Sequence, residues 1–300
     1  MSDNLSNKHS SNVGSALKRA QLSKSTQDFA RLLTAIERAG PQALRCQGLL
    51  TPKRQAYRVG ITGPPGAGKS TLLSELLKKY TKTNLKIGVI AVDPTSPFSQ
   101  GAILGDRIRY AEEALGENIF VRSLGTRGSL GGLASAVYLM LRAFDACNFD
   151  LVFVETVGVG QVEVEVMNVA DQVVLVLVPE SGDSIQAMKA GVIEMADLIV
   201  VNKSDRPGAE TLKRELESQL NLFENSDAKV ISASALNGEG VSEISKAIAE
   251  MKKEGRQKTE RQSPERLQAE ALALKRFEIE NQARRKTRNI KTAADLKKLF

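Results

Sequence analysis

One octapeptide decides the fold that we predict for this chain: Gly63-Pro64-Pro65-Gly66-Ala67-Gly68-Lys69-Ser70, with Thr71 directly after it. It fits the pattern G-x-x-x-x-G-K-[ST] and lies between a β-rich run at 58–62 and a helical stretch at 69–80, as this motif requires. The glycines permit a tight turn whose N–H groups point at phosphate oxygens. In such a loop the lysine meets the β- and γ-phosphates, and the serine hydroxyl ligates Mg²⁺. The octapeptide therefore predicts a nucleotide phosphate-binding loop.

Short apolar runs alternate with helical stretches after this loop. Strands are predicted at 58–62, 86–92, 150–155, 172–178, 198–202 and 229–232, and helices at 69–80, 132–146, 184–195 and 210–220. Several of the runs are almost continuously apolar, which is typical of strands buried on both faces of a parallel sheet. The alternation predicts an α/β fold in which a doubly wound, mostly parallel sheet carries helices on both faces.

The remaining segments are predicted to extend a nucleotide-binding domain at 53–253. Residues 1–24 are polar and predicted to be disordered, while apolar residues at helical spacing predict a helical segment within 25–52: Phe29, Leu32, Leu33 and Ile36. Residues 254–300 are predicted to form a basic helical arm. From Lys252 to Phe300 fifteen Lys and Arg face seven Asp and Glu, so this end of the chain accounts for the whole net charge of +7.

Composition excludes several classes of function. No apolar run approaches the about 20 residues that cross a bilayer, and the start lacks the apolar core of a signal peptide, so we expect a cytoplasmic protein without a membrane partner. We interpret the basic arm as a solvated face and do not expect nucleic acid to bind it. The single histidine, His9, lies in the polar start, which excludes a histidine base, and nothing near the two cysteines resembles a metal site.

The base of the nucleotide is predicted from Asn202-Lys203-Ser204-Asp205, which follows an apolar strand. In such an N-K-x-D segment the Asp205 carboxylate can accept hydrogen bonds from two adjacent N–H donors that guanine has and adenine lacks. A site built on this pairing discriminates strongly, because the wrong base leaves a charge unpaired. The loop Ser234-Ala235-Leu236 follows the next strand and is predicted to be a second contact with the base. The expected ligands are GTP and GDP.

Carboxylates near the ends of the predicted strands form the candidate metal site. Asp93 and Glu155 end two strands and Asp106 lies in a loop, so the expected Mg²⁺ ligands are Ser70, Asp93, Asp106 and Glu155. The segment from Glu155 to Gly158 resembles the D-x-x-G switch element with Glu in place of Asp, and the Gly158 N–H is placed to sense the γ-phosphate.

Hydrolysis without a histidine base rests on positioning a water and stabilising charge around the γ-phosphate. Arg107, Arg109 and Lys189 are candidate cations, although a surface or structural charge is the more common role for such residues. We assign the reaction itself to Lys69, Asp93, Glu155 and Lys189.

Several strings together resemble one family over residues 25–250, the ArgK/MeaB GTPases. They are Gly63–Thr71, Val92-Asp93-Pro94-Thr95-Ser96, Gly105-Asp106-Arg107, Gly131-Gly132, the string Glu155-Thr156-Val157-Gly158-Val159-Gly160-Gln161, and the segment from Gly182 to Lys189. The resemblance implies a SIMIBI-type fold shared with metallochaperone and signal-recognition GTPases. It also implies that Gln186 and Lys189 belong to an additional switch loop.

The function implied by the resemblance is that of a homodimeric GTPase. Such a protein acts as chaperone and regulator of a B12-dependent acyl-CoA mutase such as methylmalonyl-CoA mutase, in cofactor loading and protection. Two alternatives stay open at this point. The first alternative is a GTP-dependent assembly or targeting factor for another client protein. The second, which ranks last, is a transport-linked protein kinase.

Overall fold

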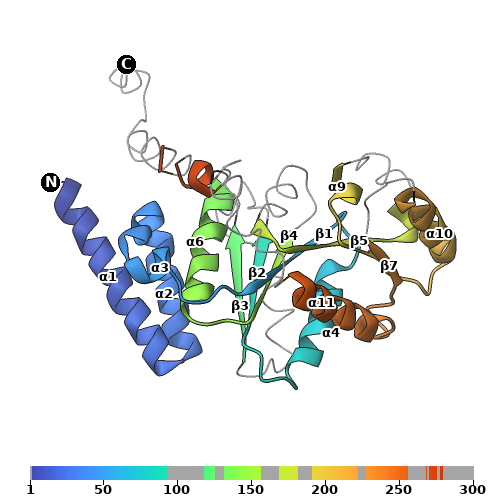
Figure 1. Cartoon of the computed structure of the whole chain (residues 1–300), viewed down its shortest axis with the longest axis horizontal. Helices are drawn as coiled ribbons and strands as arrows, with labels where there is room; N and C mark the ends of the chain where they lie inside the picture. Colours follow the sequence, from blue (N-terminus) through green and yellow to red (C-terminus); the bar gives the residue numbers. More distant parts are fainter. Residues whose placement is uncertain are drawn as a thin grey trace, which may run out of the picture.

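The fold is a seven-stranded parallel sheet with helices on both faces (Figure 1). The computed structural model describes residues 2–93, 118–125, 132–156, 169–181, 191–221, 228–255, 268, 270–275 and 278–279. The strands are β1 (Tyr57–Thr62), β2 (Ile87–Asp93), β3 (Ile119–Gly125), β4 (Leu151–Thr156), β5 (Gln172–Leu177), β6 (Leu198–Val201) and β7 (Lys229–Ser232). Their order is β3-β2-β4-β1-β5-β6-β7 and all neighbours pair in parallel. The predicted α/β class is confirmed.

All six predicted strands are present, and β3 is the strand that the sequence did not predict. β3 lies at one edge of the sheet and carries Arg122 and Ser123 inside an otherwise apolar run. Charged residues are common on edge strands, where they discourage pairing with other chains. The Arg122 guanidinium donates to Glu37 at 2.8 Å from the N-terminal helices. Those polar residues hid the strand from a search for apolar runs.

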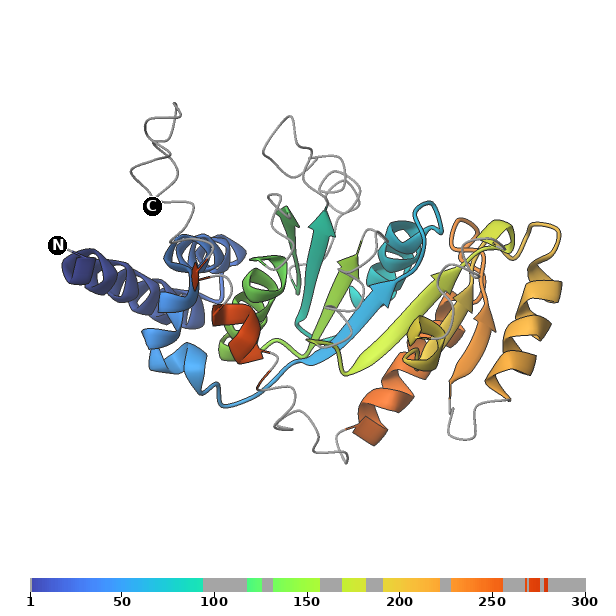
Figure 2. The same ribbon diagram turned by 90° about the horizontal axis from the view of Figure 1, so that it is seen from above.

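The helices divide between the two faces of the sheet, as Figure 2 shows from above. On one face lie α4 (Lys69–Tyr80) and α11 (Val241–Gly255), packed on the central strands. On the other face α6 (Gly132–Ala146) covers β2 and β4, and α9 (Gly191–Glu194) with α10 (Ala209–Leu220) covers β5 and β6. The bounds predicted for α4 and α6 agree with the structure. Residues 184–190 of the helix predicted at 184–195 lie outside the described residues.

The N-terminal region differs from the prediction, because residues expected to be disordered form α1 (Ser2–Ser23). Val13, Leu17 and Ala20 recur on one face of this helix and are buried against the core that α6 also contacts. Burial of such a stripe stabilises a helix whose composition is otherwise polar. Three apolar residues in a Ser/Asn-rich stretch were too few to reveal it in the sequence alone.

The next segment agrees with the prediction. α2 (Thr26–Ala39) begins after Ser25, whose Oγ accepts from the N–H groups of Gln27 and Asp28. A serine at this position satisfies N–H groups that the first turn of a helix leaves without partners. The apolar residues predicted for α2 are all buried: Phe29, Leu32, Leu33 and Ile36. A 3₁₀ turn, η1 (Gly40–Arg45), and a short helix, α3 (Gln47–Leu50), lead from α2 toward β1.

The described part of the C-terminal arm is helical and lies beside α6 (Figure 1). Arg142 of α6 holds it through two parallel bonds to Glu270, Nε to Oε1 at 2.5 Å and Nη2 to Oε2 at 2.9 Å. Such bidentate pairs fix orientation as well as distance. None of the described helices combines the length and the apolar character needed to span a membrane.

The docking of α1 generates a test of stability. Leu17 is 4% exposed, so Leu17→Ala should lower the free energy of unfolding by about 2–4 kcal/mol, because it leaves a cavity in the core. The matched control is Leu22→Ala, since Leu22 lies on the same helix and is 84% exposed. Urea denaturation measures both. Equal stabilities for the two variants would mean that α1 does not pack as described.

Candidate functional site

The candidate site lies at the carboxyl edge of the sheet, where the loops after β1, β4, β6 and β7 meet. In open α/β sheets this edge is where ligands bind. The structure brings together there the phosphate-binding loop (63–70), Glu155 at the end of β4, the segment Asn202 to Asp205, and the loop Ser234 to Leu236. Residues that are far apart in the sequence therefore share one site, as the sequence predicted for a parallel sheet.

The phosphate-binding loop is held in its turn by three glycines with positive φ, at 140° for Gly63, 76° for Gly66 and 85° for Gly68. A Cβ atom on Gly63 would lie 2.1 Å from the carbonyl oxygen of Val176, so the loop presses directly on β5. A Cβ atom on Gly66 would meet nothing within 4 Å. The loop is therefore packed tightly at its base and open at its tip, which suits a group that approaches the backbone closely.

Lys69 is the first residue of α4, and its ammonium group lies inside the loop. Its Nζ donates to the carbonyl oxygens of Gly63 at 2.7 Å and Pro64 at 2.9 Å, and the side chain is 6% exposed. A phosphate oxygen is a stronger acceptor for an ammonium group than a carbonyl oxygen is. The geometry thus fits a phosphate-binding role for Lys69.

Ser70 and Glu155 meet at the candidate metal position. The Ser70 hydroxyl donates to Glu155 Oε1 at 2.6 Å, and the Glu155 side chain is buried. Both are hard oxygen donors at one point beside the phosphate-binding loop, which is the chemistry that Mg²⁺ prefers. Glu155 reaches Ser70 from the next strand, because β4 pairs with β1 with Glu155 opposite Ile61. The residues present therefore fit the predicted ion.

Asn202 connects the phosphate-binding loop to the base-side loop. Its Nδ2 donates to the carbonyl oxygen of Ala67 at 2.8 Å, and its Oδ1 accepts from the N–H of Ala235 at 3.0 Å. The residue is almost completely buried. The sequence predicted Asn202 as a contact of the base, and the structure adds that its amide fixes the distance between two loops.

Asp205 lies beside Ser234, whose hydroxyl donates to Asp205 Oδ1 at 2.7 Å. This hydrogen bond is the main cause that lowers the pKa of the Asp205 carboxyl below its usual value, with the backbone and nearby Arg206 and Lys203 contributing. Asp205 therefore stays ionised at every pH above the mildly acidic range, as recognition of a pair of N–H donors requires. Two residues before Asp205, Lys203 has a positive φ of 56°. In the base-side loop from Ser234 to Leu236, the Leu236 side chain is 87% exposed.

Four residues join the site without having been predicted as site residues. Thr156 Oγ1 donates to Thr62 Oγ1 at 3.2 Å and so links the end of β4 to the start of the phosphate-binding loop. Arg206 pairs with Glu180, so that the segment after Asp205 is tied to the turn after β5. The threonines could have been found from their place at predicted strand ends, whereas an exposed ion pair such as Arg206 with Glu180 leaves no sequence signal.

Several predicted residues are not placed. Asp106, Arg107, Arg109, Gly158, Gln186 and Lys189 lie outside the described residues. Asp93 is the last residue of β2, opposite Gly125 of β3. Its backbone thus ends at the same edge of the sheet as Glu155.

The sequence of this chain is similar to that of a known family and of several known proteins. Residues 29–289 match the family model described as "Methylmalonyl Co-A mutase-associated GTPase MeaB". The chain is 52% identical over 194 residues to a Pyrococcus abyssi protein with a provisional GTPase name, covering 64% of this chain and 60% of that protein. It is 40% identical over 210 residues to the mouse mitochondrial protein named methylmalonic aciduria type A homolog, covering 68% of this chain and 50% of that protein. The matches thus span about half to three fifths of the length of these two relatives.

Among solved structures, the fold is similar to one titled as a LAO/AO transport system kinase. The TM-score is 0.67 at 27% sequence identity, covering 93% of this chain and 87% of that one. A hydrogenase maturation factor HypB from Archaeoglobus fulgidus shares the fold at a TM-score of 0.50 and 22% identity. These likenesses support the predicted SIMIBI-type P-loop fold.

The close approach of Gly68 to Asn202 allows a test of whether Asn202 holds the two loops of the site together. A Cβ atom on Gly68 would lie 2.4 Å from Asn202 Nδ2, so Gly68→Ala should push the two loops apart and weaken GDP binding by at least about tenfold. Gly208→Ala is the matched control, because Gly208 lies outside the phosphate-binding loop and has a similar positive φ of 87°, but its Cβ atom would meet no atom closer than 3.7 Å. Isothermal titration measures both affinities. If both variants bind GDP equally well, the Asn202 contact does not hold the site.

Proposed function

This chain belongs to the MeaB family of methylmalonyl-CoA mutase-associated GTPases, and from that premise we propose that it binds GTP and hydrolyses it to GDP and phosphate. The observation that carries the proposal is the meeting of three groups at one edge of the sheet. They are the phosphate-binding loop, the Ser70–Glu155 pair and the base-side loops, with Asn202 bonded to both ends. A nucleoside triphosphate with Mg²⁺ has one part that matches each of these groups: a phosphate chain, a metal ion and a base.

The phosphate end of the site suggests how the residues act. In our proposal Lys69 leaves the carbonyl oxygens of Gly63 and Pro64 and donates to the β- and γ-phosphates. Water attacks the γ-phosphorus, the bond to the bridging oxygen breaks, and GDP departs with that oxygen. Glu155 and Asp93 orient water molecules around the γ-phosphate at the carboxyl edge of the sheet. Lys189 stabilises the negative charge that develops on the phosphate oxygens as the bond breaks.

The proposed metal is Mg²⁺, which would neutralise phosphate charge and would be held by Ser70, Asp93, Asp106 and Glu155. The 2.6 Å hydrogen bond between Ser70 and Glu155 supports this donor set. The Gly158 N–H is proposed to sense the γ-phosphate. Arg107 and Arg109 remain candidates for further charge stabilisation.

The base end is proposed to select guanine. Asp205 accepts from the two N–H groups of guanine, and Ser234 holds the carboxylate in place through its own donated bond. Lys203, Ala235 and Leu236 line the base on either side. Adenine lacks the donors that Asp205 needs, so ATP should bind far more weakly.

The cellular role follows from the family. We propose that the protein is a homodimer that acts in the cytoplasm as chaperone and regulator of a B12-dependent acyl-CoA mutase. The description of the family and the name of the mouse relative support this client. A GTP-dependent assembly factor for another client protein remains the second candidate, supported by the unusually basic arm.

The first experiment measures steady-state GTP hydrolysis by the protein, alone and with a B12-dependent acyl-CoA mutase from the same organism. We expect slow hydrolysis alone and faster hydrolysis with the mutase. Slow hydrolysis that the mutase leaves unchanged would point to a different client. Transfer of the γ-phosphate to a protein instead of water would favour the kinase alternative.

The same assay includes Lys69→Ala, which should reduce hydrolysis by at least about 100-fold, because the phosphates lose the one cation the described loop supplies. Lys78→Ala on the outer face of α4 is the matched control and should hydrolyse GTP normally, since Lys78 is exposed and pairs with nearby Glu75 at 2.8 Å. Turnover by Lys69→Ala near that of the control would contradict the assignment of the site.

Asp205→Asn tests the base assignment. We expect the preference for GTP over ATP to fall by at least about tenfold, because an amide offers only one acceptor oxygen to the two donors of guanine. Glu239→Gln is a suitable control, since Glu239 is an exposed acid in the turn after Ser234. Competition binding with GDP and ADP measures the preference. If Asp205→Asn keeps the same ratio of GDP to ADP affinity, the base is recognised by other residues than Asp205.

A further inference from the structure

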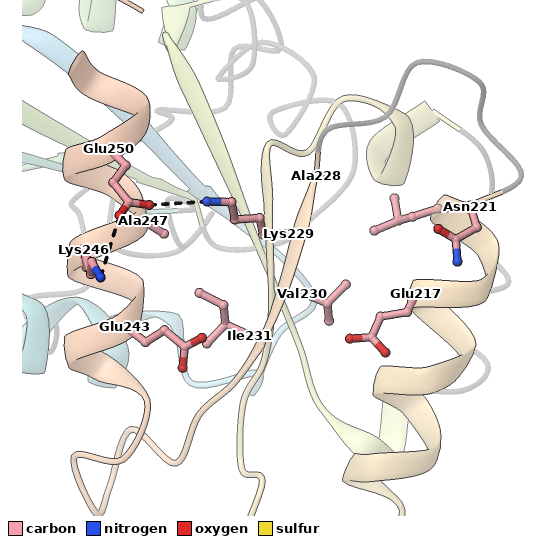
Figure 3. Close-up of a pocket in the computed structure, with 11 residues that line it drawn as sticks. Glu217, Asn221, Ala228, Lys229, Val230, Ile231, Glu243, Lys246, Ala247 and Glu250 are labelled. Carbon is pink, nitrogen blue, oxygen red and sulfur yellow. Dashed lines mark hydrogen bonds and ion pairs between the residues drawn. The ribbon is translucent and has the colours of Figure 1, made fainter. Parts of the chain in front are cut away.

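A cavity of about 500 Å³ lies along the outer edge of β7, apart from the nucleotide site (Figure 3). β7 is the last strand of the sheet, so one of its edges has no neighbouring strand. α10 flanks this edge on one side and α11 on the other, and Figure 3 shows β7 between them. We call this cavity the β7 groove. Its volume is within the range of about 300–1,000 Å³ typical of ligand sites.

The backbone of β7 offers hydrogen-bonding groups to the groove. The N–H groups of Lys229 and Ala233 donate to Asp197 and Val201 on the β6 side, at 3.4 and 2.9 Å. Alternate residues of a strand face opposite edges, so the N–H and C=O groups of Val230 and Ser232 face the groove. The turn at Gly240 covers the Ser232 carbonyl oxygen, which would lie 2.3 Å from a Cβ atom there. None of the described residues bonds to the three remaining groups of this edge: Val230 N–H, Val230 C=O and Ser232 N–H.

The side chains of the groove give it two different walls. Val230 points toward α10 and Ile231 toward α11, as Figure 3 shows. Glu217 of α10 extends toward Val230, and Glu243 of α11 extends toward Ile231. An acidic side chain therefore lies on each side of the open strand edge.

The two lysines that line the groove lie beside the same glutamate. Lys229 and Lys246 both lie near Glu250, at 3.3 and 4.0 Å, so one carboxylate serves two ammonium groups. Lys213 lies 3.9 Å from Glu217 on α10, a long contact between exposed groups that contributes only a few tenths of a kcal/mol. Glu243 has no described ion-pair partner within 4.0 Å. Added positive charge would thus find carboxylates at Glu217 and Glu243.

We propose that the β7 groove binds an extended segment of a partner protein that carries two adjacent Lys or Arg residues, added to the sheet as an eighth strand. A strand added at an open edge gains main-chain hydrogen bonds, and its side chains give specificity. Successive side chains of a strand point to opposite faces, so two neighbouring basic residues would meet Glu217 and Glu243 separately. Helices on both sides leave room at β7 for a single extended chain. This inference does not rest on the proposed GTPase function.

The test uses a synthetic peptide, acetyl-Thr-Val-Lys-Arg-Val-Thr-amide, and the full chain. We expect it to bind and to shift the backbone amide signals of Val230 and Ser232 in NMR spectra, with no shift in the phosphate-binding loop. A peptide with Glu-Glu in place of Lys-Arg should bind at least about tenfold more weakly. Absence of binding by the basic peptide up to its solubility would overturn the proposal.

Three variants separate strand addition from a general attraction of charges. Val230→Pro removes the outward N–H and leaves the bonds to β6 intact, so peptide affinity should fall at least about tenfold, while Val230→Ala keeps the N–H and should bind normally. The double variant Glu217→Lys with Glu243→Lys should lose the basic peptide and bind the acidic one. This gain of binding cannot come from misfolding. Equal affinities in Val230→Pro and Val230→Ala, or an unchanged preference in the double variant, would overturn the proposal.

Discussion

The arrangement of the candidate site depends on one buried side chain, Asn202. Its amide group donates to Ala67 in the phosphate-binding loop and accepts from Ala235 in the base-side loop, at 2.8 and 3.0 Å. A buried amide that lost either partner would leave an unsatisfied polar group, which costs about 1–3 kcal/mol. The two loops therefore keep a fixed separation, and a ligand that spans them meets a site that is already formed. Gly68 permits this contact because it has no Cβ atom.

Around this fixed frame, the charged groups already have partners that a ligand can replace. Lys69 donates to two carbonyl oxygens of its own loop, and the Ser70 hydroxyl donates to Glu155. Each contact satisfies a buried polar group, so the loop does not carry the cost of an orphaned charge. Phosphate oxygens are stronger acceptors for an ammonium group than carbonyl oxygens are. Binding thus exchanges partners at the phosphate end and leaves the Asn202 contacts in place.

The sequence predicted most of this architecture because the sheet is parallel and buried. Short apolar runs, several of them almost continuous, marked six of the strands, and the octapeptide at 63–70 located the phosphate end of the site. β3 was missed because Arg122 and Ser123 interrupt its run at the edge of the sheet, and α1 was missed because its buried residues, Val13, Leu17 and Ala20 among them, are spaced apart in a polar stretch. The bracing role of Asn202 and the open edge of β7 could not be predicted, since both depend on which strands become neighbours in space.

A crystal structure with a non-hydrolysable GTP analogue and Mg²⁺ tests the central claim most directly. We predict that the analogue lies along the carboxyl edge of the sheet, with Lys69 Nζ moved from Gly63 and Pro64 to the phosphates and Ser70 separated from Glu155. Asn202 should keep both of its hydrogen bonds, to Ala67 and Ala235. An analogue bound away from this edge, or bound there with the Asn202 contacts broken, would contradict the account.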